Sequence, residues 1–123
     1  MNNYDDIDFL APWCALNKIF GFSPKTGLEA IRHFGSAADI FRANKKELSG
    51  FFGYGSKYTG LISGKALQES AEELTGLKDS GSRFICIGDS RYPQMLRECE
   101  DPPIGLYIKG KTPIEKLDGG RPA

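Results

Sequence analysis

Residues 9–24 read FLAPWCALNKIFGFSP, and this stretch determines the architecture more than any other. Its apolar residues recur at steps of three and four, which is the period of one buried helical face. They are Phe9, Leu10, Trp13, Leu16, Ile19 and Phe20. Gly21 interrupts the pattern. Ser23 can cap a new helix, and Pro24 suits its first position, where a missing N–H group loses no helical partner. The stretch predicts a helix, a tight hairpin and a second helix.

The second helix is predicted to run to about Phe34, because Gly35 is a typical helix terminator. Ser36 can then cap a short helix that continues through Ile40 and Phe41. The sequence thus predicts two helices in close succession after the first hairpin.

The helix–hairpin–helix pattern then occurs a second time. A short helix is predicted over residues 45–51, and Gly53-Tyr54-Gly55 breaks it. Ser56 can cap a long helix that reaches roughly Leu77. Two copies suggest an internal repeat, although repeat arrays usually contain more.

The pattern changes after residue 80. Residues 84–87 form a short apolar run that favours a β-strand. Residues 92–99 can form a short helix, and Pro102-Pro103 forces an extended approach to a second strand over residues 104–109. Two strands are not stable alone in water, so we expect the helical domain or another segment to cover them.

The predicted fold is therefore mainly α. A small bundle of the helix-hairpin-helix or sterile-alpha-motif (SAM-like) kind is expected over residues 9–79. A short two-stranded α/β remnant follows over residues 80–110 and is expected to lead into a Rossmann-like domain that the sequence does not include. Residues 1–8 are expected to be loose, and residues 111–123, rich in Gly, Pro and charge, to form a linker or tail.

Composition narrows the function classes. Sixteen basic and sixteen acidic residues leave no net charge, so the chain is not a strongly cationic nucleic-acid binder overall. Between Cys14 and Ser70, however, eight basic residues face four acidic ones. Three cysteines without a C-x-x-C pair, and one histidine, predict neither a disulfide framework nor a metal site. With no signal pattern or long apolar run, we expect a cytoplasmic protein without membrane contact.

Two sequence blocks carry a family resemblance. The first is ALNKIFGFSP at residues 15–24, together with FGS at 34–36, IF at 40–41 and EL at 47–48. The second and more specific is GDSRYPQMLR at 88–97, followed by DPPIGLYIKG at 101–110. The chain thereby resembles the N-terminal region of the DNA-processing protein A family, also called DprA or Smf, from about residue 12 to 110.

The resemblance implies a cytoplasmic, non-catalytic protein that binds single-stranded DNA and helps load a RecA-type recombinase during natural transformation. It also implies that the main DNA-binding and dimerising surface lies on the Rossmann-like domain, whose glycine- and arginine-bearing motif is expected after Ala123. A homodimer is therefore expected only through that further domain, and DNA binding by the present chain is expected to be weak.

The two hairpins are the candidate DNA-binding sites, because glycine lets backbone N–H groups approach phosphate at the positive end of the next helix. The second hairpin comprises Gly53, Tyr54, Gly55, Ser56 and Lys57; the first comprises Gly21, Phe22, Ser23 and Lys25, with Pro24 removing one donor. Such contacts would follow the DNA backbone and weaken with salt. The alternative is that both hairpins only turn the chain, with Phe20, Phe22, Phe52 and Tyr54 buried as staples.

Two other functions remain open at this point. The bundle is similar to SAM-like domains, so it can be a protein-interaction module without DNA binding of its own. Residues 105–112, GLYIKGKT, match the phosphate-loop pattern G-x-x-x-x-G-K-[ST]. We reject an ATP-binding enzyme because the intervening residues are strand-like and a phosphate loop must follow a buried strand. We therefore expect no cofactor.

Overall fold

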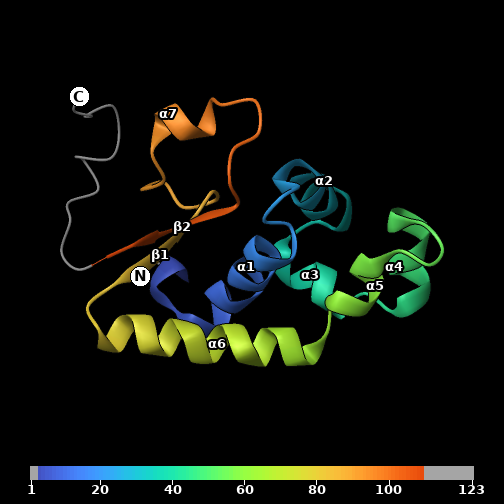
Figure 1. The fold of residues 1–123 in the computed structure, drawn as a ribbon, viewed down its shortest axis with the longest axis horizontal. Coiled ribbons are helices and arrows are strands. Elements are labelled where there is room, and N and C mark those ends of the chain that lie inside the picture. Colours follow the sequence, from blue (N-terminus) through green and yellow to red (C-terminus); the bar gives the residue numbers. More distant parts are fainter. Residues whose placement is uncertain (1–2, 110–123) are drawn as a thin grey trace.

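The computed structural model describes residues 3–109, which form a mainly helical fold with a small antiparallel sheet (Figure 1). Within that range there are seven α-helices, two strands and one 3-10 helix, η1 (Asn3–Asp5). The α-helices are α1 (Ile7–Ile19), α2 (Pro24–Phe34), α3 (Ala37–Arg42), α4 (Lys45–Phe52), α5 (Lys57–Leu61), α6 (Gly64–Asp79) and α7 (Gln94–Arg97). The strands are β1 (Arg83–Cys86) and β2 (Gly105–Ile108). The predicted fold class is confirmed at this level.

Helix ends follow the predicted signals closely. Gly35 ends α2 with a φ of 108°, a conformation that favours glycine. Ser36 caps α3, its hydroxyl accepting a hydrogen bond from the Asp39 N–H at 3.1 Å. Pro24 opens α2 as predicted, but the Ser23 side chain makes no capping hydrogen bond. The capping role predicted for Ser23 is therefore wrong.

The long helix predicted from Ser56 to Leu77 is wrong in one respect, because the chain bends at Ile62 and Ser63. Ile62 lies in the core, 7% exposed, and has extended backbone angles. The Ser63 hydroxyl caps α6 by accepting a hydrogen bond from the Ala66 N–H at 3.3 Å. The burial of Ile62 and the cap at Ser63 divide the predicted helix into two, α5 and α6.

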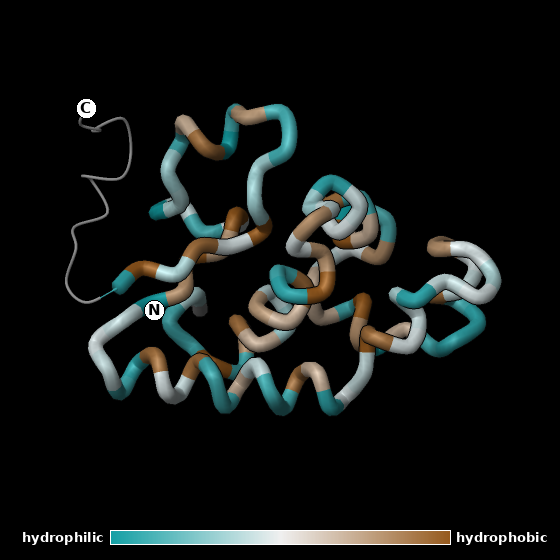
Figure 2. Tube along the Cα trace, viewed as in Figure 1, coloured by the Kyte–Doolittle hydropathy of each residue, from teal (hydrophilic) through white to brown (hydrophobic). Residues whose placement is uncertain are grey.

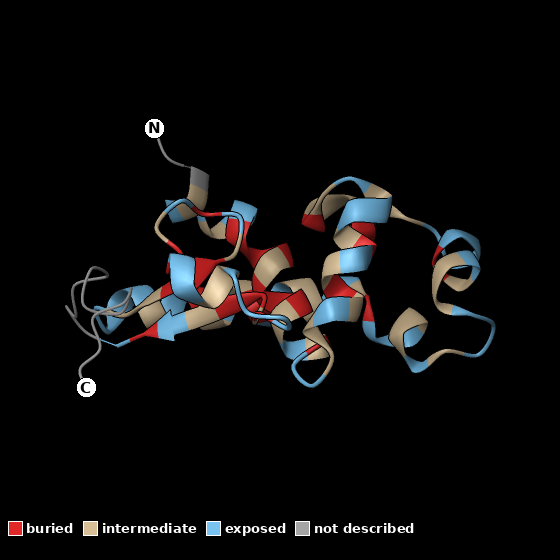
Figure 3. Cartoon of the chain, turned by 90° about the horizontal axis from the view of Figure 1, so that it is seen from above, coloured by how far each residue is buried: buried red, intermediate tan, exposed pale blue. Residues whose placement is uncertain are grey.

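The molecule is built around α1, which α6 accompanies along its length (Figure 1). Hydrophobic and hydrophilic positions alternate along α6, as expected for a helix with one face inward (Figure 2). Buried positions gather along α1 and the neighbouring strands, whereas the α4–α5 end is mostly intermediate or exposed (Figure 3). One core cluster surrounds Leu16 and Phe20, and a second surrounds Leu10 and Phe84.

The two strands pair antiparallel, with Phe84 opposite Tyr107. Phe84 and Cys86 pack with α1 and α6, so the helical domain covers this face of the sheet as expected. On the other face, Ile85 and Ile108 pack against Tyr92. The sheet is therefore enclosed by residues of the described range.

The N-terminal residues differ from the loose segment that was expected. Asn3–Asp5 form η1, and α1 begins at Ile7 rather than Phe9. The Asp6 carboxylate caps α1 by accepting a hydrogen bond from the Asp8 N–H at 3.0 Å. Tyr4 and Ile7 pack against the second core cluster, which gives this segment its order. The tail expected over residues 111–123 lies outside the described residues.

Candidate nucleic-acid interface

The second hairpin presents an aromatic ring to solvent. Tyr54 is 101% exposed and lies between Gly53 and Gly55, whose φ angles are 102° and 79°. No atom lies within 4 Å of the position that a side chain would take at either glycine. The space beside both α-carbons is therefore open, and the positive φ angles explain why glycine occupies both positions.

The residues after Tyr54 anchor the hairpin to α5. The Ser56 hydroxyl accepts a hydrogen bond from the Tyr58 N–H at 3.2 Å, so it caps the helix as predicted. The Lys57 ammonium group lies 5.4 Å from the centroid of the Tyr58 ring. That cation–π contact places a positive charge in the first turn of α5, three residues after the exposed Tyr54.

The first hairpin is arranged differently. Phe22 is fully exposed at its tip, 105% by relative area. The Lys25 N–H, in the first turn of α2, donates a hydrogen bond at 3.1 Å to the carboxylate of Asp101. Asp101 lies in the segment before β2. Because its carboxylate binds the Lys25 N–H, it supplies a negative charge at the N-terminus of α2. This end of α2 is already occupied by an anion of the same chain.

The expectation that four aromatic residues act as buried staples is half right. Phe20 is buried, and its ring centroid lies 4.5 Å from that of Tyr58 and 5.8 Å from that of the half-buried Phe52. Phe22 and Tyr54, by contrast, have no cover from the described residues. In each hairpin, therefore, one aromatic residue packs inward, Phe20 or Phe52, and the other, Phe22 or Tyr54, lies in solvent.

The segment that carries the second hairpin has a small excess of positive charge. Residues 45–61, from the start of α4 to the end of α5, contain three lysines and one acidic residue, Glu47. Glu47 already has a partner, since it forms a capping box with Asn44. Elsewhere Lys18 forms an ion pair with Glu73, which raises the pKa of the lysine. The α4–α5 end is thus more basic than the chain as a whole.

The block GDSRYP, which carries much of the family resemblance, forms a buried ion pair. Asp89 is 0% exposed, and its carboxylate accepts hydrogen bonds from the Arg91 N–H at 2.9 Å and from the Arg91 guanidinium at 2.7 Å. The pair raises the pKa of Arg91. Arg97 donates to the Asp89 carbonyl at 2.9 Å. Asp89 and Arg91, two residues apart, thus form a hydrogen-bonded pair whose carboxylate is buried.

Two of the three cysteines are buried thiols. Burial raises the pKa of Cys86 to about 12 and also raises that of Cys14, although its contact with the Tyr107 hydroxyl at 3.5 Å acts in the opposite direction. A thiol with a raised pKa is a poor nucleophile. In residues 3–109, no group of three or more His, Cys, Asp or Glu side chains is arranged to hold a metal ion.

The phosphate-loop pattern begins inside the sheet. Gly105–Ile108 form β2, and the Gly105 N–H donates a hydrogen bond to the side chain of Asn17 at 3.0 Å. Gly105 is therefore not a phosphate-binding residue in this structure, and Gly110 to Thr112 lie outside the described range. None of the helices in that range combines the length and apolar character needed to span a membrane.

We found no match between this chain and any family model, curated protein or solved structure. The functional assignment consequently depends on the geometry of the hairpins and on the sequence resemblance.

Proposed function

We propose that the chain is a single-stranded-DNA-binding module that contacts DNA through its second hairpin, Gly53 to Lys57. The observation that carries the proposal is Tyr54, a ring fully in solvent between two glycines with open surroundings. Proteins that bind single strands combine aromatic side chains, on which bases stack, with positive charges along the backbone path. Tyr54 supplies the stacking surface and Lys57 the adjacent charge.

The contact does not depend on the dipole of α5, since α5 contains only five residues. It depends on base stacking and on ion pairing with phosphate. Both interactions are indifferent to base identity, so binding is expected to show little sequence preference and to weaken with salt. Lys45 and Lys46, at the start of α4, extend the positive charge beyond the hairpin.

In the wider proposal, this module belongs to a recombination mediator of the DprA kind, in the cytoplasm, and assists the loading of a RecA-type recombinase. The support is the sequence resemblance, together with a helical unit that contains two hairpins. The SAM-like character of the bundle, and a Rossmann-like domain beyond β2, are parts of the same proposal. Within it, this module acts as an accessory contact without catalysis.

The direct test is a fluorescence anisotropy titration of labelled oligothymidylate at low salt with the wild type, Tyr54→Ala and Tyr54→Phe. Loss of one base–aromatic stack removes about 1–3 kcal/mol, so Tyr54→Ala is expected to weaken binding by at least about fivefold. Tyr54→Phe keeps the ring and is expected to bind like the wild type.

Lysine variants test the electrostatic half of the contact. Lys57→Glu is expected to weaken binding and reduce the slope of log K against log salt by about 0.7, the value for one phosphate contact on a single strand. Lys57→Arg keeps the positive charge and is expected to retain both the affinity and the salt slope of the wild type. Equal affinities for the wild type, Tyr54→Ala and Lys57→Glu would show that the second hairpin does not bind DNA.

The second candidate function is docking of a partner protein on the first hairpin. The specific observation is Phe22, a fully exposed apolar ring next to a helix end whose Lys25 N–H is engaged by Asp101. Because the Lys25 N–H is already hydrogen-bonded, the exposed ring suits an apolar surface of a partner protein better than a phosphate group. Phe22→Ala is therefore expected to leave the anisotropy titration unchanged, whereas a loss of DNA affinity would assign this hairpin to DNA as well.

A further inference from the structure

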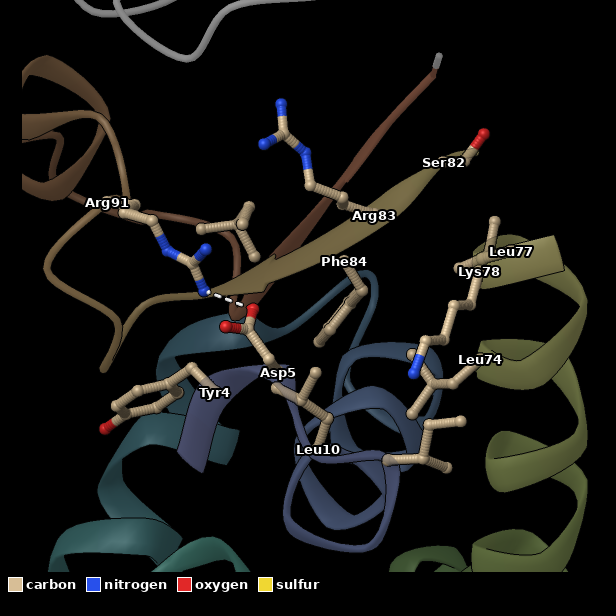
Figure 4. A pocket seen from close by; sticks show the side chains of 12 residues that line it. Tyr4, Asp5, Leu10, Leu74, Leu77, Lys78, Ser82, Arg83, Phe84 and Arg91 are labelled. Atoms are coloured by element: carbon tan, nitrogen blue, oxygen red, sulfur yellow. Dashed lines mark hydrogen bonds and ion pairs between the residues drawn. The ribbon is translucent and has the colours of Figure 1, made fainter. Parts of the chain in front are cut away.

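A cavity of about 270 Å³ opens at the end of the molecule opposite the α4–α5 hairpin (Figure 1). It lies between η1, the start of α1, the end of α6 and β1. Its inner wall is apolar and includes Leu10, Leu74, Leu77 and Phe84 (Figure 4). An apolar wall with a few polar groups at the edge is the usual composition of a small-molecule site.

The edge of the cavity is mostly cationic. Of the residues in the 3–109 range, Lys78, Arg83 and Arg91 line it, against one carboxylate, Asp5. Figure 4 shows the Lys78 side chain extending from α6 toward Leu74. Among the described residues Lys78 has no ion-pair partner within 4.0 Å, so its charge is available to a ligand beside the apolar wall.

Asp5 already places an anion at this edge. Its carboxylate accepts a hydrogen bond from the Arg91 guanidinium at 3.1 Å (Figure 4). The same guanidinium also donates to the buried Asp89 at 2.7 Å. Asp5 is 67% exposed at its side chain, whereas Asp89 is 1% exposed. An exposed ion pair contributes little to stability, whereas loss of one partner from a buried pair is strongly destabilising. A ligand anion can therefore replace Asp5 while Asp89 holds the arginine in place.

We propose that this cavity binds a small amphipathic anion, a carboxylate or phosphate monoester on a short apolar chain or ring, which displaces Asp5 from Arg91. The head group takes the place of Asp5 at Arg91, Lys78 supplies a second positive charge on another side of the same cavity, and the apolar part contacts Leu74 and Phe84. The volume limits the ligand to a small molecule, because drug-sized ligands occupy roughly 300–1,000 Å³. This inference is independent of the proposed DNA binding, which involves the α4–α5 hairpin at the opposite end of the molecule.

The test uses three probes of equal chain length, octanoate, octyl phosphate and octanol, below their aggregation limits. Methyl resonances of Leu10 and Leu74 report binding, and isothermal titration gives the affinity. Octanoate or octyl phosphate is expected to shift these resonances saturably, and octanol to bind at least about tenfold more weakly because it lacks the charge. The better of the two anions identifies the head group.

Variants separate the charged contact from simple apolar binding. Lys78→Gln is expected to weaken anion binding about tenfold, and Lys78→Arg to retain it. Asp5→Asn is expected to strengthen binding, because the internal competitor is removed. Lys65→Gln, at the exposed start of the same helix, is the matched control and is expected to change nothing.

Equal binding of octanol and octanoate, shifts that do not saturate, or an unchanged affinity in Lys78→Gln would each overturn the proposal. Circular dichroism of each variant confirms that the fold is retained. The DNA titration with the wild type in the presence of saturating octanoate is expected to be unaltered, so that failure of one proposal leaves the other to be judged separately.

Discussion

Replacement of Asp89 by asparagine removes a charge from the most buried ion pair of the structure. The Asp89 carboxylate is 0% exposed and accepts hydrogen bonds from the backbone and the guanidinium of Arg91 at 2.7 to 3.1 Å. Loss of one partner from a buried pair destabilises a protein by about 3–5 kcal/mol. Because the Arg91 side chain is 30% exposed and partly hydrated, we expect the lower end, about 3 kcal/mol.

For a chain of this size about 1 kcal/mol corresponds to a shift of roughly 4 °C in the melting temperature, so Asp89→Asn is expected to melt about 12 °C below the wild type. Urea unfolding followed by circular dichroism gives the free energy, and a double-mutant cycle with Arg91→Met isolates the pair. Asp101→Asn is the matched control, since that carboxylate is exposed and has one hydrogen bond, to Lys25. If Asp89→Asn lowers the free energy of unfolding no more than Asp101→Asn does, the buried pair does not stabilise the fold as proposed.

Two further predictions concern the sheet. Gly105→Ala places a methyl group against the Phe84 ring and is expected to destabilise the fold by about 1–3 kcal/mol in urea unfolding, whereas Gly76→Ala, in an open helical position, is expected to be neutral or stabilising. Burial raises the pKa of both Tyr92 and Cys86 to about 12, so the folded state retains protons that the unfolded state loses. The stabilisation that these two groups contribute is therefore fully present below about pH 9 and is lost between about pH 9 and 12. The free energy of unfolding is expected to fall across that range, and a flat series between those pH values would contradict this.

Much of the helical framework is predictable from sequence because its signals are local. The glycines at 35 and 53 adopt positive φ angles where the chain was expected to turn. Ser36 and Ser56 cap the helices that follow them. Each signal acts within a few residues, so no knowledge of the tertiary structure was needed.

The features that were missed depend on residues distant in sequence. The hydrogen bond from the Lys25 N–H to Asp101 joins positions 76 residues apart, and that from Arg91 to Asp5 joins positions 86 apart. Neither follows from periodicity or capping preferences. The bend at Ile62 likewise depends on a core that forms only when distant helices meet.

The candidate site was predictable in composition but not in geometry. The sequence places an aromatic residue at the tip of each hairpin, yet it does not say whether Phe22 and Tyr54 face the core or the solvent. The structure exposes both, whereas Phe20, Phe52 and Tyr58 pack together at the first core cluster. Only the tertiary structure therefore shows which rings of each hairpin are available for binding.

The most direct test of DNA binding by the second hairpin is an NMR titration of the ¹⁵N-labelled chain with oligothymidylate at low salt. The amide resonances of Gly53 to Lys57 are expected to move most, and to return toward their free positions as salt is added. Shifts confined to other elements, or no shifts at an oligonucleotide concentration that saturates the anisotropy signal, would contradict this expectation.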